Sequence, residues 1–194
     1  MSIKLPDNID YSKYTSNSGM STKFFGPKLW DGLFTSILGR YPIKITTKED
    51  IQIKNTFKNT LIGLKDILPC IFCRNSFKGF LDDLPIEPYL VGRIELMYWL
   101  YLMKDKVNSK LICQERKCYN DEKSKLKAMV YNKEISEQEY YKKVKEFKQD
   151  NFETIPTPPF QEVLDKYENQ RAVCDKKAKK CRLPSKMYPL SGEE

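Results

Sequence analysis

Residues 91–111 read VGRIELMYWLYLMKDKVNSKL and form the most apolar stretch of the chain. Apolar side chains here surround nearly the whole circumference of a helix, which places such a helix at the centre of a bundle or at a subunit interface. The run is shorter than the roughly 18 uninterrupted apolar residues needed to span a bilayer. Its apolar members are Ile94, Leu96, Met97, Tyr98, Trp99, Leu100, Tyr101, Leu102, Met103 and Val107.

The segments before this stretch also carry helical patterns. Pro27 fits the first turn of a helix that runs to about residue 40. Thr47 is a plausible N-cap of a second helix, with Asp50 in the position of a capping box. That helix ends at Pro69, and a short third helix follows over residues 70–81.

After Cys118 the composition shifts toward Lys, Glu and Asn, and two further helices are predicted at 136–149 and 160–172. No long alternating segment predicts a sheet, so the fold class is all-α. We expect an irregular N-terminal arm over 1–22, a helical domain over 23–118 and a Lys/Glu-rich helical extension over 119–194.

Composition narrows the functional classes. The formal charge of +8 comes from 34 basic and 26 acidic residues that are interspersed along the chain. Such mixing indicates a solvated surface, so no nucleic-acid partner is expected. The N-terminus has no apolar h-region of a secretory signal, which favours a cytoplasmic location.

The chain has six cysteines and no histidine. The missing histidine excludes Cys-His and Ser-His nucleophilic sites and every zinc site that uses imidazole. The cysteines form three closely spaced pairs, which leaves thiol redox chemistry or a four-cysteine zinc site. The pairs are Cys70/Cys73, Cys113/Cys118 and Cys174/Cys181.

The segment Cys70-Ile71-Phe72-Cys73 suits redox chemistry because a thiol at the start of a helix has a lowered pKa. The two-residue spacing also lets the pair close into a disulfide. Zinc bound by Cys70, Cys73, Cys113 and Cys118 has acceptable ligand spacing as well. The cysteines alone leave both alternatives open.

The surrounding motifs favour redox chemistry. Their order resembles that of the Erv/ALR sulfhydryl oxidase family over residues 24–118. The motifs are Gly26-Pro27-x-x-Trp30-x-x-Leu33, Tyr41-Pro42, Pro69-Cys70-x-x-Cys73, Trp99-Leu100, Val107-Asn108-x-Lys110-Leu111 and Cys118. The resemblance implies a bundle of four core helices plus a short fifth, a homodimer, and FAD beside Cys70 and Cys73.

The resemblance also implies roles for individual residues. Trp30 would contact the adenine end of FAD, Gly26 would allow close approach of the backbone, and Tyr41 would line the cofactor pocket. Asn108 and Lys110 would bind ribose and phosphates, as part of the motif that begins at Val107. Phe34 and Lys104 occupy positions where the family has histidines, and Asp105 follows the second of these positions. The resemblance implies that these three residues would hold FAD in place of the histidine motifs.

The family's structural disulfide is also altered. Cys118 matches its second cysteine, but Tyr101 occupies the position of the first. Cys113 is the nearest alternative partner, and Cys174 and Cys181 are further candidates.

In the implied mechanism, Cys70 exchanges with the thiols of substrate proteins or of a thioredoxin-like carrier, and Cys73 reduces the flavin. Dioxygen then accepts the electrons and gives hydrogen peroxide. Cys174 and Cys181 form either a shuttle pair or a structural disulfide. The composition and the tail also resemble those of proteins of large cytoplasmic DNA viruses. The alternatives are a four-cysteine zinc module or an Erv/ALR scaffold without activity.

Overall fold

The computed structural model describes residues 10–16, 19–151, 154–175 and 180–182. In this part of the chain the predicted all-α class is confirmed, with one short pair of strands as an addition. The elements are a 3-10 turn at Tyr11–Tyr14, α1 (Thr22–Arg40), α2 (Lys48–Ile67), α3 (Ile71–Asp83), a 3-10 turn at Glu87–Tyr89, α4 (Arg93–Tyr131), α5 (Glu137–Asn151), α6 (Phe160–Glu168), β1 (Val173–Asp175) and β2 (Lys180–Arg182).

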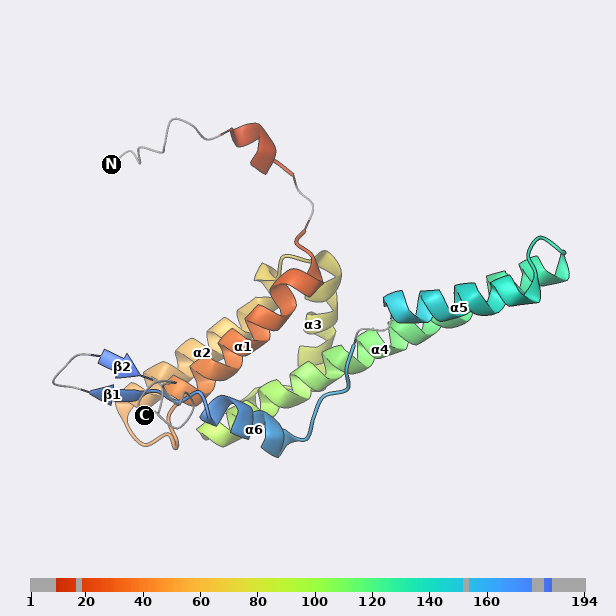
Figure 1. Ribbon diagram of the computed structural model, residues 1–194. Coiled ribbons are helices and arrows are strands. Elements are labelled where there is room, and N and C mark those ends of the chain that lie inside the picture. Colours follow the sequence, from red (N-terminus) through yellow and green to blue (C-terminus); the bar gives the residue numbers. More distant parts are fainter. Residues whose placement is uncertain (1–9, 17–18, 152–153, 176–179, 183–194) are drawn as a thin grey trace, which may run out of the picture.

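The first half of α4 is the centre of the bundle, as its apolar circumference predicts (Figure 1). Helix α1 packs on α4, α2 packs on α3, and α6 packs on both α1 and α4. The Trp99 side chain is fully buried, and its indole N–H donates a hydrogen bond of 3.0 Å to the carbonyl of Leu84. In the described residues no buried side-chain nitrogen or oxygen lacks a partner.

Local signals set the start of α2 as the sequence predicts. The Thr47 hydroxyl accepts a hydrogen bond from the Asp50 amide at 3.1 Å, and the Asp50 carboxylate accepts one from the Thr47 amide at 2.8 Å. The predicted capping box is therefore confirmed. The start of α5 has a cap as well, because the Ser136 hydroxyl accepts a hydrogen bond from the Glu139 amide at 3.2 Å.

Three predicted helix boundaries are wrong, and one of them is the end of the last helix, which was predicted at residue 172 and lies at Glu168. Helix α1 begins at Thr22, so Pro27 lies inside the helix and beyond its first turn. Helix α4 does not end near residue 111 but continues without a break to Tyr131. The second half of α4 packs against α5. The contacts of α4 with the bundle end near residue 111, and contacts with α5 take their place.

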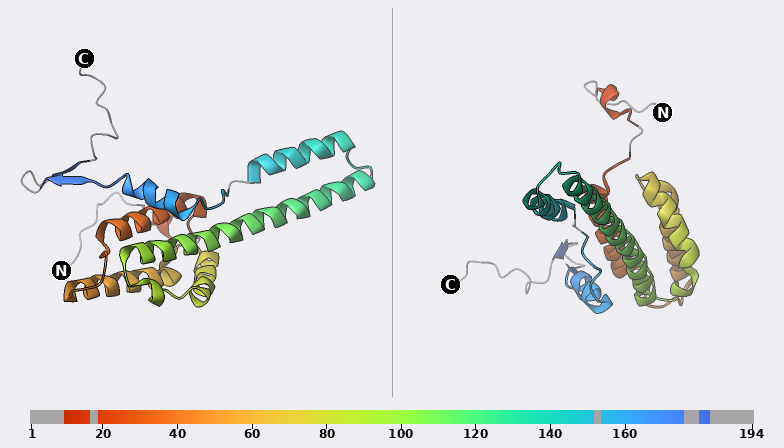
Figure 2. Two further views of the ribbon diagram at one scale, coloured as in Figure 1. Left: turned by 90° about the horizontal axis from the view of Figure 1, so that it is seen from below. Right: turned by 90° about the vertical axis from the view of Figure 1, so that its right-hand side faces the viewer.

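The second half of α4 and α5 form a helical hairpin that projects from the bundle (Figures 1 and 2). Leu126 and Tyr140 are buried between the two helices. The connecting turn contains Lys133, whose φ of 61° lies in the left-handed region. The other apolar side chains of this hairpin are at most half-buried, so it is a surface arm rather than an addition to the core.

Helix α6 covers the seam between α1 and α4. The Tyr167 ring stacks on Phe34 with centroids 5.0 Å apart, and its hydroxyl donates a 2.6 Å hydrogen bond to Asp31. Phe160 packs against Tyr98 and Tyr101 of α4. The extension predicted to begin at residue 119 therefore returns to the bundle.

After α6 the strands β1 and β2 pair antiparallel, with Cys174 directly opposite Cys181. Their side chains lie outside the described part of the structure. Three-residue strands are too short to show an alternating pattern, which is why the sequence did not predict them. None of the described helices is both long and apolar enough to cross a membrane.

Candidate active site

Cys70 is the N-cap of α3, in extended backbone geometry, and Cys73 lies in the first turn of the helix. The Cys70 Sγ accepts a hydrogen bond from the backbone N–H of Cys73 at 3.2 Å. Both thiols are free and half-buried. The first thiol therefore lies at the positive end of the helix dipole and receives one of its unpaired N–H groups.

The two thiols have pKa values that shift in opposite directions. Burial raises the pKa of Cys70, but hydrogen bonds from Cys73 and Phe72 and the charge of Arg74 outweigh burial and leave the pKa below its ordinary value. Burial, the hydrogen bond with Cys70 and the charge of Cys70 raise the pKa of Cys73 to about 11. The pair thus has an outer thiol that ionises readily and an inner thiol that resists ionisation.

Two cations oppose the raised pKa of Cys73. They are Lys110 on α4 and Arg74 on α3. The Lys110 ammonium donates a hydrogen bond to Ser76, which lies three residues after Cys73 and therefore near it on the same helix face. Lys110 is thus held beside the inner thiol.

Two hydrogen bonds from other parts of the chain hold the loop before α3. Arg74 donates a hydrogen bond to the carbonyl of Leu68, and the Met20 amide donates one to the carbonyl of Pro69 at 3.3 Å. A Cβ on Gly19 would lie 2.1 Å from the same Pro69 oxygen, so this close approach requires glycine. These contacts fix the backbone that carries Cys70.

The predicted cofactor residues on α1 and after it differ in accessibility. Trp30 is half-buried against the core, and a Cβ on Gly26 would meet nothing within 4 Å. Phe34 and Tyr41 are fully buried, and the Tyr41 hydroxyl donates a 2.8 Å hydrogen bond to the carbonyl of Leu90. Burial and the charge of Glu95 raise the pKa of Tyr41 to about 12.

The predicted cofactor residues on α4 face two different neighbours. Lys110 faces α3, whereas the Asn108 amide donates hydrogen bonds to Thr157 at 2.9 Å and to the carbonyl of Ile155 at 3.4 Å. A spacing of two residues turns about 200° around a helix, so these two side chains cannot share a face.

Lys104 lies one turn before Asn108, on the side of Phe34. Its Nζ is 5.9 Å from the Phe34 ring centroid and has no hydrogen-bond partner among the described residues. Burial, followed by the charge of Lys166, lowers the pKa of Lys104. Asp105 and Val107, between Lys104 and Asn108, are half-buried.

The second described cysteine pair differs from the first. Cys113 and Cys118 are free and exposed, in the middle of α4. Five residues of helix advance about 7.5 Å along the axis, which exceeds the Cα separation of about 4.4–6.8 Å that a disulfide spans. A disulfide between them therefore requires α4 to open.

The described residues also give no support to a zinc site. No three cysteine or acidic side chains among them come together in a way that could hold a metal ion. Cys70, Cys73, Cys113 and Cys118 thus do not form a four-cysteine cluster in this part of the chain.

Sequence reasoning did not identify Arg74, Ser76 or the residues of α6. The positions of Arg74 and Ser76 follow from helical spacing once Cys70 is taken as the N-cap. Asp31 and Tyr167 are 136 residues apart, and their hydrogen bond depends on tertiary packing that periodicity does not reveal.

No protein family matches the sequence, and no curated protein matches it either. Among solved structures the chain is similar to the core of yeast Erv1, with 26% sequence identity. The match covers 47% of this chain and 72% of that chain, with a TM-score of 0.40.

Proposed function

We propose that the chain is an FAD-dependent thiol oxidase that forms disulfide bonds in substrate proteins. The observation that carries this proposal is the asymmetric pair at the start of α3. Cys70 has a lowered pKa and Cys73 a raised one, and cations of α3 and α4 lie beside Cys73. The order of the motifs between Gly26 and Cys118 gives independent support from the sequence.

In the oxidised enzyme Cys70 and Cys73 are joined by a disulfide. A substrate thiolate attacks the Cys70 sulfur, a mixed disulfide forms, and Cys73 leaves as a thiolate. The charges of Lys110 and Arg74 stabilise this thiolate, and the charge of Cys70, which raises the pKa of Cys73 in the reduced pair, is absent while Cys70 is bonded to the substrate. The second substrate thiolate then attacks the substrate sulfur, the mixed disulfide breaks, and Cys70 leaves as a thiolate that the helix N-terminus stabilises.

The exchange leaves a substrate disulfide and a Cys70/Cys73 pair that holds two electrons and two protons. Bound FAD would supply the two-electron acceptor for this pair, with dioxygen as the final oxidant and hydrogen peroxide as the product. The role of Cys73 as the inner thiol agrees with its greater burial.

Part of the predicted FAD site fits the cofactor. Lys104 is a half-buried cation on which the charge of Asp31 acts, but it has no described hydrogen-bond partner, and a phosphate would supply one. The side of Gly26 is open, and Trp30 offers a half-buried aromatic ring. We propose that these three residues hold the cofactor.

The remaining predicted FAD contacts require rearrangement. Asn108 and Lys110 already bind groups of the chain itself, so they reach the cofactor only by exchanging these partners. Phe34 and Tyr41 are enclosed in the core and would support the site from beneath. Their roles, and those of Asp105 and Val107, stay predictions.

The surface at the pair suits a protein substrate. Ile71 and Phe72, between the two cysteines, are 58% and 77% exposed. Apolar side chains beside an accessible thiol favour a partner that brings an apolar segment with its own thiols. We propose protein dithiols, including a thioredoxin-like carrier, as substrates.

Cys174 and Cys181 remain candidates for a shuttle pair. Opposite residues of an antiparallel pair have Cα atoms about 4.5–5.5 Å apart, which is within disulfide range. The register of β1 and β2 thus supports the pairing of these two cysteines with each other.

We also propose that the chain forms a homodimer through its first two helices, as the sequence resemblance implies. Light scattering on the purified protein is expected to give twice the monomer mass of 22.9 kDa. A monomer mass at all concentrations would contradict this part of the proposal without touching the thiol chemistry.

Two measurements on the purified full chain test the oxidase. Acid-released cofactor is expected to chromatograph as FAD, and the FAD-loaded protein is expected to consume oxygen with dithiothreitol. Failure to bind FAD after reconstitution would overturn the proposal.

A further inference from the structure

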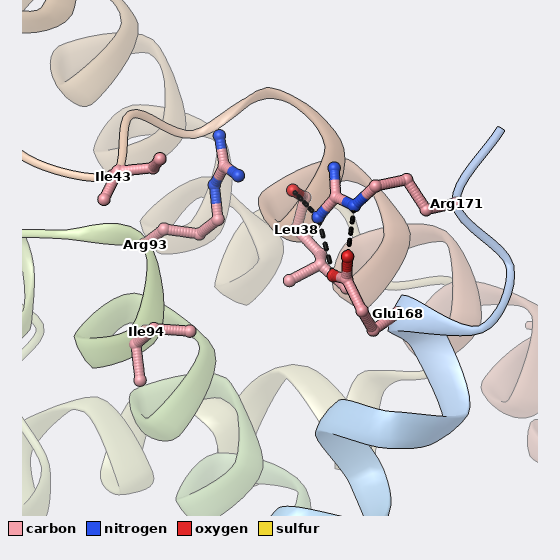
Figure 3. A pocket seen from close by; sticks show the side chains of 6 residues that line it. All are labelled: Leu38, Ile43, Arg93, Ile94, Glu168 and Arg171. Carbon is pink, nitrogen blue, oxygen red and sulfur yellow. Dashed lines mark hydrogen bonds and ion pairs between the residues drawn. The ribbon is translucent and has the colours of Figure 1, made fainter. Parts of the chain in front are cut away.

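A pocket lies at the end of the bundle formed by the C-terminus of α1, the N-terminus of α4 and the C-terminus of α6. It is a shallow hollow that is open to solvent, with a volume of about 430 Å³. Helix α1 has 19 residues and is therefore about 28 Å long. It separates this pocket from the loop at Cys70. Six residues line the pocket: Leu38, Ile43, Arg93, Ile94, Glu168 and Arg171 (Figure 3).

The pocket contains two guanidinium groups and a single carboxylate. Arg171 binds this carboxylate, with distances of 2.5 and 2.7 Å to Glu168, and also donates to the carbonyl of Leu38 at 3.3 Å. Arg93 uses its Nε to donate a 2.6 Å hydrogen bond to the carbonyl of Tyr41. Its four remaining N–H donors have no acceptor among the described residues. The three charges leave a net charge of +1.

The fold holds the two cations near one another. Burial lowers the pKa of Arg93, and the positive charge of Arg171 lowers it further, while Glu168 opposes both effects. In Figure 3 both guanidinium groups stand on the same side of the pocket. A bound anion between them would relieve their repulsion and use the free donors of Arg93.

The start of α4 lies beside Arg93 but does not add to the site. The Glu95 carboxylate lies against the N-cap residue Gly92, where a Cβ would meet its Oε2 at 2.4 Å. The negative charge that a helix N-terminus favours is thus supplied by the chain itself. The site therefore depends on the two arginines.

The rest of the lining is apolar. Leu38 is buried, whereas Ile43 and Ile94 are 71% and 49% exposed. The pocket thus combines a cationic side with an aliphatic side. Ligand sites often join a few polar groups that fix orientation with an apolar wall.

We propose that this pocket binds a small oxyanion, a carboxylate or a phosphate, that carries a short aliphatic group. The oxyanion bridges Arg93 and Arg171 by charge-assisted hydrogen bonds, and the aliphatic group lies against Leu38, Ile43 and Ile94. This inference is independent of the cysteine pair and of FAD.

Isothermal titration of the full chain at constant ionic strength tests the site with three probes: butyl phosphate, inorganic phosphate and pentanoate. Butyl phosphate is expected to bind about tenfold more tightly than inorganic phosphate, because its methylene groups leave water. Saturable binding of pentanoate would add carboxylates to the ligands, and its absence would restrict the site to phosphates. Arg171→Met is expected to weaken butyl phosphate binding by about 10- to 100-fold.

Arg40→Met is the matched control, because Arg40 lies at the same end of α1 and pairs with Glu49 outside the pocket. It is expected to leave binding unchanged. Ile94→Ser is expected to weaken butyl phosphate binding and to leave inorganic phosphate binding as it was. Equal losses in Arg171→Met and Arg40→Met, or no binding of any probe beyond that of chloride at the same ionic strength, would overturn the proposal.

Discussion

Cys70 and Cys73 stand at the beginning of α3, whereas Cys113 and Cys118 lie in the middle of α4. At the helix start, backbone N–H groups are unpaired and one of them binds the Cys70 sulfur. In mid-helix the N–H groups are already paired within the helix. Position relative to a helix end, more than spacing in the sequence, therefore gives a cysteine pair its chemistry.

The largest expected effect separates the two pairs by activity. Cys70→Ser and Cys73→Ser each remove one sulfur of the exchanging disulfide and are expected to lower oxygen consumption with dithiothreitol by about 1,000-fold or more. Cys113→Ser and Cys118→Ser, the matched controls, are expected to stay within twofold of the unmodified chain. Loss of activity in the controls would remove the distinction between the pairs.

A second expected effect separates the two thiols of α3. At pH 7 a thiol with a pKa near 11 is ionised in about one molecule in 10,000, against about one in 30 for an ordinary thiol. The reduced protein is therefore expected to react with iodoacetamide at Cys70 at least about 100-fold faster than at Cys73. The rate at Cys73 is expected to rise with pH up to about 11. Mass spectrometry of the peptides measures both rates, and equal rates would contradict the asymmetry.

A third, smaller effect tests the cation beside Cys73. Lys110→Met removes one of the two charges that lower the pKa of Cys73, so this pKa is expected to rise further. Alkylation of Cys73 at pH 8 in cofactor-free protein is expected to slow by about three- to tenfold.

Two variants control this third test. Lys110→Arg keeps the charge and is expected to restore the rate. Lys106→Met removes a cation one turn earlier on α4, where it pairs with Asp83, and is expected to change nothing. If Lys106→Met slowed the alkylation of Cys73 equally, the net charge of the chain and not the position of Lys110 would set this rate.

The smallest effect concerns stability. Because Cys113 and Cys118 are exposed, replacing both by serine is expected to change the free energy of unfolding by less than about 0.5 kcal/mol. Urea denaturation with and without reductant measures this change. A loss of several kcal/mol would indicate a structural disulfide or a bound metal at these cysteines.

The sequence predicted those features that depend on neighbouring residues. The cap at Thr47, the helix start at Cys70 and the central position of Trp99 each follow from a few adjacent residues or from one period. The length of α4 did not follow, because its second half is stabilised by α5 and has few apolar residues. Lys and Glu have good helix propensity, but composition alone does not show where such a helix ends.

The candidate site, like the fold, could be predicted only where it depends on residues that are close in the sequence. The sequence indicated both cysteines and predicted Lys110 as a ligand of FAD, yet it did not indicate that Lys110 lies beside Cys73 while Asn108 binds Thr157. Which side of α4 meets α3 is decided by packing between elements distant in sequence. The contact of α6 with Phe34 depends on the same kind of packing.

The most direct test of the account follows the electrons. FAD-loaded full chain is mixed with dithiothreitol in the absence of oxygen, and the loss of flavin absorbance is recorded. The account predicts rapid bleaching in the unmodified chain and in the Cys113→Ser, Cys118→Ser double variant, and none in the Cys70→Ser, Cys73→Ser double variant. Equal bleaching in the Cys70→Ser, Cys73→Ser double variant would contradict the central claim.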